Sequence, residues 1–215
     1  MINGFKCLEN IDLEKKLIMG NHDIENSIDK SCSSLKIQLK LPTYDIKFPF
    51  SYDLYYLYQD SQKEIYETIL FIYLDTSLYD DILNDINSCY KSVLNIDINK
   101  LREEQDKFLS NTLKKIDEIL YNINNVIFFA HEPLFMFKNK DNKNKSSVKT
   151  KLLKILFEEK IKYSKIEFYW ICADYHIYQN SIITNDLFSG QKITQWIFGT
   201  GRGELDNVPT LFEAH

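Results

Sequence analysis

The chain has 215 residues, which is enough for one substantial hydrophobic core and favours one domain over two. It is 44% hydrophobic and 27% charged, near the average of soluble globular domains, so neither a disordered nor a fibrous chain is indicated. The formal net charge is −5, from 26 Lys and Arg against 31 Asp and Glu. This balance argues against a nucleic-acid backbone as the main partner, because such binding usually needs clustered basic residues.

Seven short segments rich in apolar, β-branched and aromatic residues predict strands. In chain order they cover residues 16–19, 54–58, 69–74, 126–130, 167–172, 177–183 and 193–198. Strands mixed with helices in one chain predict α/β or α+β layering. Periodicity alone does not choose between the two.

Residues 101–123, between the third and fourth of these strands, predict a long amphipathic helix, because apolar side chains recur there near helical spacing. A second helix is predicted at 148–160. The segment 138–147 before it carries four lysines among Asn and Ser, and it predicts a flexible surface loop. The alternative for this segment is a lip that attracts phosphate.

The four cysteines, Cys7, Cys32, Cys89 and Cys172, are widely spaced and form no zinc pattern. They predict reduced thiols in an intracellular setting. Charged residues interrupt the first 20 positions, so no signal peptide is predicted, and the longest apolar runs are too short to span a bilayer. We therefore expect a cytoplasmic protein with no membrane partner.

The first candidate motif is Gly20-Asn21-His22-Asp23, which directly follows the strand predicted at 16–19. Glycine permits a sharp turn at the end of that strand. The turn would present an amide oxygen for a metal, an imidazole for a leaving oxygen and a carboxylate that orients the imidazole. Considered alone, the segment fits equally well a turn with local Asn and Asp hydrogen bonds.

Two further strands end in polar residues, at the position where α/β folds gather binding groups. His131 follows the strand at 126–130, although a lone histidine there is more often structural than a ligand. Asp174 and His176 follow the strand at 167–172, and residues two apart in extended backbone point to the same side. An edge strand with a polar face explains this pair equally well. The fourth histidine of the chain, His215, is its last residue and belongs to no motif.

The order of these motifs resembles the calcineurin-like metallophosphoesterases. That family has, in order, Asp-x-His, Gly-Asp-x-x-Asp, Gly-Asn-His-Asp/Glu, a single His after a strand, and Gly-His-x-His. The resemblance runs from about residue 2 to the C-terminus and implies a layered α/β/β/α sandwich, here without its first strands and helix. It implies hydrolysis of a phosphate ester by hydroxide that two metal ions activate. The segment Leu74-Asp75-Thr76 also resembles a family segment, to which we assign structure rather than catalysis.

The resemblance also implies the metal ligands. Asn21 and His131 would bind one ion, and His176 the other. Asp174 stands where the family has the first His of Gly-His-x-His, and a carboxylate there favours harder ions such as Mn²⁺ or Mg²⁺. Two divalent ions (Mn, Fe, Zn or Mg) are expected in a complete enzyme.

The same comparison gives roles to the two remaining residues of the first motif. His22 would contact the phosphate and protonate or stabilise the leaving oxygen, and Asp23 would orient His22. A histidine in this position contributes roughly 10²–10⁴-fold as a general acid.

The family's first two motifs are missing, since nothing before Gly20 resembles them. The metal that His176 binds then has a single protein ligand, so we expect one ion or none to be held tightly. Three explanations stay open: a truncated gene product, an N-terminal part supplied in cis or in trans, or a degenerate relative that no longer catalyses. We expect truncation of a single domain that spans 1–215, which would leave open strand edges and exposed apolar faces. The alternative function is a non-catalytic binding or interaction protein, and the substrate is not readable.

Overall fold

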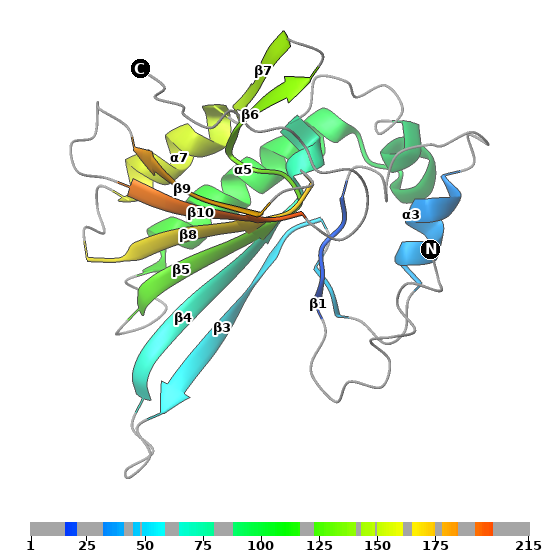
Figure 1. Cartoon of the computed structure of the whole chain (residues 1–215). Coiled ribbons are helices and arrows are strands. Elements are labelled where there is room, and N and C mark those ends of the chain that lie inside the picture. The colour runs from blue at the N-terminus through cyan, green and yellow to red at the C-terminus, as the bar shows by residue number, and fades with distance from the viewer. Residues whose placement is uncertain are drawn as a thin grey trace, which may run out of the picture.

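The computed structural model describes residues 16–20, 32–40, 45–47, 49–58, 65–79, 88–116, 123–140, 143–148, 150–160, 165–174, 178–184 and 192–199. Its centre is a six-stranded sheet in the order β3-β4-β5-β8-β10-β9 (Figure 1). Its strands are β3 (Ser51–Tyr58), β4 (Ile65–Leu74), β5 (Ile123–Ala130), β8 (Glu167–Cys172), β9 (Tyr178–Thr184) and β10 (Lys192–Phe198). The four inner strands are parallel and the two outer strands, β3 and β9, run antiparallel to their neighbours. The fold is therefore mixed α/β, and each of the predicted strands in this sheet is confirmed.

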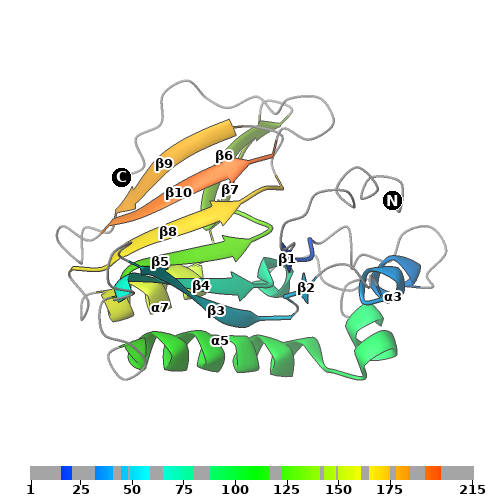
Figure 2. The same cartoon turned by 90° about the horizontal axis from the view of Figure 1, so that it is seen from below.

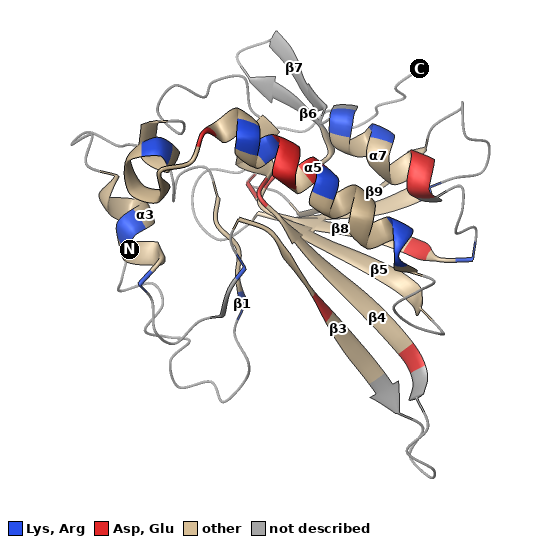
Figure 3. Ribbon diagram, turned by 180° about the vertical axis from the view of Figure 1, so that it is seen from behind, with Lys and Arg blue, Asp and Glu red and all other residues tan. Residues whose placement is uncertain are grey.

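One face of the sheet forms the main hydrophobic core against two helices, α5 (Ile98–Lys114) and α7 (Thr150–Lys160) (Figure 2). Alternate residues of each inner strand point to this face, for example Val126 and Phe128 of β5, and both are fully buried. Figure 3 shows charged residues spread along α5 and α7, while the strands carry few. None of the described helices is long and apolar enough to cross a membrane.

Helix α5 begins at a strong N-cap, because the Asp97 side chain accepts hydrogen bonds from the backbone N–H groups of Asn99 and Lys100. Its buried positions recur every three or four residues: Ile98, Leu101, Gln105, Leu109, Thr112 and Leu113. The predicted helix at 101–123 is thus confirmed in type but wrong at both ends. It starts earlier, at the cap, and Ile123 begins β5.

The segment 138–147 is not a loop in the described residues. It belongs to a hairpin of β6 (Phe135–Lys140) and β7 (Lys143–Val148), which pair antiparallel over six residue pairs. The loop prediction is wrong because backbone pairing does not require apolar side chains, so a Lys- and Asn-rich sequence carried no strand signal. The helix predicted at 148–160 is α7, which begins two residues later.

A second, smaller core joins short elements at one end of the sheet. These are α3 (Ser33–Gln38), the 3₁₀ turn η1 (Thr76–Tyr79) and the π-helical turn η2 (Tyr90–Leu94), and Met19 and the first turn of α5 also belong to this core. Just before Met19, β1 (Lys16–Leu17) pairs parallel with β2 (Asp45–Ile46). A disulfide between Cys32 and Cys89 lies within this second core. The expectation of reduced cysteines is therefore wrong for this pair, because their separation of 57 residues concealed that the fold brings them together.

The opposite face of the sheet is apolar and aromatic. Phe71, Phe129 and Tyr73 contact one another there, with ring centroids 5.2 and 5.5 Å apart. Toward the β9 edge the exposure rises, to 45% for Phe198 and 66% for Tyr178. This part of the sheet therefore exposes apolar side chains.

Candidate functional site

The ends of three strands bring together three of the residues that the sequence singled out. Gly20 lies three residues after β1, His131 directly follows β5, and Asp174 lies two residues after β8. The Ala173 backbone N–H donates a 2.8 Å hydrogen bond to the His131 carbonyl oxygen. This bond continues the pairing of β5 with β8 and fixes the two turns relative to each other.

His131 and Asp174 direct their polar atoms at each other. His131 Nε2 lies 3.3 Å from Asp174 Oδ1, and each side chain is about one-quarter exposed. The contact lacks hydrogen-bond geometry, and among the described residues Nε2 has no hydrogen-bond partner. Two metal-binding donor atoms therefore lie side by side, each on a partly exposed side chain, although Nε2 itself is buried.

Asp174 does not lie in extended backbone, as the sequence argument for it and His176 assumed. Its φ is 61°, in the left-handed region, which Asp tolerates better than most residues. The same-side argument is therefore wrong at this position, because β8 has already ended at Cys172. His176 lies outside the described residues.

Gly20 is packed directly against the imidazole of His131. A Cβ atom added to Gly20 would lie 2.7 Å from both Cε1 and Nε2 of that ring, closer than real contacts allow. The sequence predicted a glycine needed for a sharp turn, whereas the structure shows one needed for close approach. Asn21, His22 and Asp23 lie outside the described residues.

The turn after His131 is held by Thr76 and Trp170, for which the sequence predicted no functional role. The Glu132 backbone N–H donates to Thr76 Oγ1 at 2.9 Å, and Trp170 Nε1 donates to the Glu132 carbonyl oxygen at 3.1 Å. Thr76 follows β4 and Trp170 belongs to β8, so both neighbouring strands of β5 support the histidine. Only Thr76 had a sequence signal, through its resemblance to a family segment.

Asp75 is a buried carboxyl group at the end of β4, 2% exposed. It accepts hydrogen bonds from the Ser77 N–H at 3.0 Å, the Ser77 hydroxyl at 2.5 Å and the Tyr90 hydroxyl. Burial raises its pKa to about 6, although these donors and the nearby His131 oppose the shift. These contacts agree with the structural role expected of Asp75.

Gln105 of α5 attaches the helix to the end of β4. Its Oε1 accepts from the Asp75 backbone N–H at 2.8 Å, and its Nε2 donates to the Asp75 carbonyl oxygen at 3.0 Å. The sequence contained a signal for this residue, since a Gln among the apolar positions of a helix face needs buried partners.

The described donors fit part of a metal site. An imidazole nitrogen and a carboxylate oxygen are ligands that Zn²⁺, Fe²⁺ and Mn²⁺ accept. Within the described residues no group of three His, Cys, Asp or Glu side chains is close enough to hold an ion. The predicted set also needs Asn21 and His176, which are not described.

Comparison with known proteins adds little. No family model matches the chain, and no curated protein sequence matches it. Among solved structures, one similar chain is described as "GAP50 the anchor in the inner membrane complex of Plasmodium", with a TM-score of 0.47 at 14% identity. The similarity covers 78% of this chain and 44% of that one, so the chain spans less than half of that protein. A likeness of this size supports no inference about function.

Proposed function

We propose that the chain is part of a calcineurin-like metallophosphoesterase and contributes to the hydrolysis of a phosphate ester. The observation that supports the proposal is the meeting of Gly20, His131 and Asp174. The motif resemblance requires the Gly-Asn-His-Asp turn and the single His after a strand to share one site. Gly20 packs against the His131 ring, which is the arrangement this requirement needs.

In the proposed site each residue has one role. His131 presents Nε2 and Asp174 presents Oδ1 as neighbouring donors, with Asn21 and His176 as the further ligands. Divalent ions held by these residues would supply a hydroxide from bound water and neutralise the phosphate oxygens. His22, oriented by Asp23, donates a proton to the leaving oxygen.

The layered α/β/β/α sandwich is the finer part of this proposal. Support comes from the aromatic face of the sheet and from the position of β1 and β2 against it. The Lys16 and Lys47 ammonium groups lie 5.5 Å from the ring centroids of Tyr55 and Tyr73, and both contact Asp53 within 3.0 Å. In the proposed sandwich, β1 and β2 belong to a second sheet that packs on this face.

The proposal is tested by Mn²⁺ binding and by hydrolysis of p-nitrophenyl phosphate, each measured on the full chain. His131→Ala and Asp174→Asn should each weaken Mn²⁺ binding at least tenfold, since even changes outside the ligand set cost about 10–100-fold. His22→Ala should slow hydrolysis with little loss of Mn²⁺ affinity. His215→Ala, outside every motif, is the matched control.

The outcomes separate the two functions considered. Hydrolysis that depends on His131 and His22 supports the enzyme. Mn²⁺ binding that depends on His131, without hydrolysis by the native chain, supports the non-catalytic binding protein. Hydrolysis that is unchanged in both His131→Ala and His22→Ala contradicts the assigned site.

A further inference from the structure

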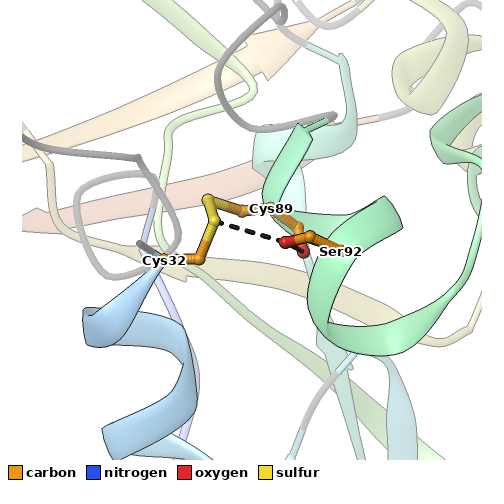
Figure 4. The surroundings of a disulfide bond; sticks show 3 residues. All are labelled: Cys32, Cys89 and Ser92. Atoms are coloured by element: carbon orange, nitrogen blue, oxygen red, sulfur yellow. Dashed lines mark hydrogen bonds between the residues drawn. A yellow bond between two sulfur atoms is a disulfide. The ribbon is translucent and has the colours of Figure 1, made fainter. Parts of the chain in front are cut away.

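The Cys32–Cys89 disulfide joins two segments that are remote in the sequence (Figure 4). Cys32 immediately precedes α3, and Cys89 immediately precedes η2. Both cysteines are buried, at 4% and 0% exposure, and the Ser92 hydroxyl donates to Cys32 Sγ at 3.5 Å. The cross-link therefore joins the start of α3, which follows Gly20 in the sequence, to the start of η2, which precedes α5.

The elements around the disulfide are too short to be stable by themselves. In the second core they are a six-residue helix, a four-residue 3₁₀ turn and a five-residue π-helical turn, which pack against the first turn of the longer helix α5. Isolated helices shorter than about 12 residues are marginal in water. The second core contains eight buried residues, Met19, Cys32, Leu35, Leu78, Cys89, Tyr90, Ile98 and Leu101, and the cysteines are two of them. Small cores of this kind commonly depend on a disulfide.

The second core supports the candidate site from two sides. Met19, a member of the core, is bonded to Gly20, whose backbone lies against His131. Tyr90, adjacent to Cys89, donates its hydroxyl hydrogen to Asp75, which is followed by Thr76 and its bond to the turn after His131. The disulfide is therefore connected to the imidazole through covalent bonds, packing and two hydrogen bonds.

We propose that Cys32 and Cys89 are oxidised while the chain folds in an oxidising compartment, and that this cross-link keeps the candidate site assembled. Formation removes one hydrogen from each thiol, and the two electrons pass to a disulfide oxidant, which becomes a dithiol. Because both sulfurs are buried, a dithiol reductant acts after the second core opens. The cross-link is a permanent part of the fold, and its location differs from the cytoplasmic one predicted from sequence.

Formation of the disulfide does not rest on the proposed function and is tested by peptide mapping. Producing cells are lysed directly into denaturant that contains N-ethylmaleimide, so that buried thiols, Cys172 among them, are blocked before any oxidation follows. The expected result is a linked peptide pair that contains Cys32 and Cys89, while Cys172 carries the blocking group. Recovery of Cys32 and Cys89 both blocked would overturn the inference.

The consequence for stability is tested by thermal unfolding without metal. A reductant, tris(2-carboxyethyl)phosphine, should lower the Tm of the native chain by about 10 °C, because a cross-link over a loop of this length removes much unfolded-chain entropy. It should lower the Tm of Cys172→Ala equally, and should leave the Tm of the Cys32→Ala, Cys89→Ala double variant unchanged. A native Tm that does not respond to full reduction would overturn the supporting role of the cross-link.

The consequence for the site rests on the proposed function and is measured with Mn²⁺ alone. Reduction should weaken Mn²⁺ binding by the native chain at least tenfold, at a temperature where circular dichroism shows the reduced chain still folded. Equal affinity in the two states would overturn this step. Absence of Mn²⁺ binding in the oxidised chain would refute the proposed function instead, and peptide mapping and Tm would still decide the disulfide.

Discussion

Gly20 and His131 were identified as candidate site residues from the sequence, and the structure adds how they pack together. The sequence marked both, because each follows an apolar strand, and the structure places them in contact. Their contact could not be read from sequence, since it depends on how β1 lies relative to β5. Asp174 was found for a reason that does not hold, because its left-handed backbone, and not an extended strand, directs the carboxylate toward His131.

Replacing Gly20 with Ala tests this contact directly. The new methyl group would meet the His131 ring at 2.7 Å, so the ring or the turn must move, at a cost of about 1–3 kcal/mol. Denaturant unfolding should show this loss for Gly20→Ala in the native background. In a His131→Ala background the same substitution should be nearly neutral, which gives a measurable coupling energy. Equal losses in the two backgrounds would show that the ring is not what Gly20 accommodates.

Asp75 gives a pH dependence whose sign follows from its raised pKa. Its folded pKa of about 6 exceeds the ordinary value of 3.8, so between these values the folded state binds more protons than the unfolded state. Stability from this group is present below pH 3.8 and is lost as pH rises to about 6, by roughly 3 kcal/mol. The loss is complete at neutral pH.

The variant Asp75→Asn removes this titration. Unfolding free energies measured by denaturant at several values between about pH 4 and 7 should show a smaller decline toward pH 7 in Asp75→Asn than in the native chain. Glu103→Gln, an exposed position on α5, should keep the native pH profile. Parallel pH profiles for Asp75→Asn and the native chain would mean that the buried carboxyl does not titrate in this range.

For whole helices and strands, the sequence predicted the type of element better than the residues at which it begins and ends. Periodicity revealed α5 because Leu101, Phe108 and Leu113 recur near helical spacing. Its start at Ile98 depends on the Asp97 side-chain cap, and its end was hidden by the apolar residues of the sequence before β5. The polar part of the hairpin β6–β7 and the short turn η2 gave no regular apolar pattern. Short elements that are stabilised by backbone pairing or by a neighbouring core leave little trace in composition.

Gln105 tests how strongly α5 is tied to the end of β4. Gln105→Ala leaves the Asp75 backbone N–H and carbonyl without their side-chain partner in a buried site, and each loss costs about 1–3 kcal/mol. We expect a destabilisation of about 2–4 kcal/mol in denaturant unfolding. Glu103→Ala, exposed on the same helix, should change stability by less than about 0.5 kcal/mol. Similar losses for both variants would indicate a helix effect rather than the bond to β4.

For the whole molecule, the asymmetry of the sheet is the main feature. One face is closed by α5 and α7, while the other presents aromatic side chains that become more exposed toward β9. The strands alternate between the two faces, so the apolar character of both faces was legible in nearly continuous apolar segments such as Val126 to Ala130. Which face of the sheet the helices cover depends on the connections between strands and helices, so it could not be predicted from the apolar pattern of the strands.

The exposed part of the second face should bind apolar probes. Tyr178, Trp196 and Phe198 form a contiguous group, with ring centroids 5.4 and 5.8 Å apart, and soluble proteins rarely expose such patches without a partner surface. The double variant Trp196→Gln, Phe198→Gln should therefore lower the fluorescence of a bound hydrophobic dye and reduce self-association in sedimentation.

Tyr52 provides the matched control for this face. It is 42% exposed, similar to Phe198, but it lies on the helix-covered side, where its ring stacks with that of Phe108 of α5. Tyr52→Gln should leave dye binding and self-association nearly unchanged. If it lowers both as much as the double variant does, dye binding reports general aromatic exposure. The β9 side of the sheet would then have no special tendency to accept a second layer.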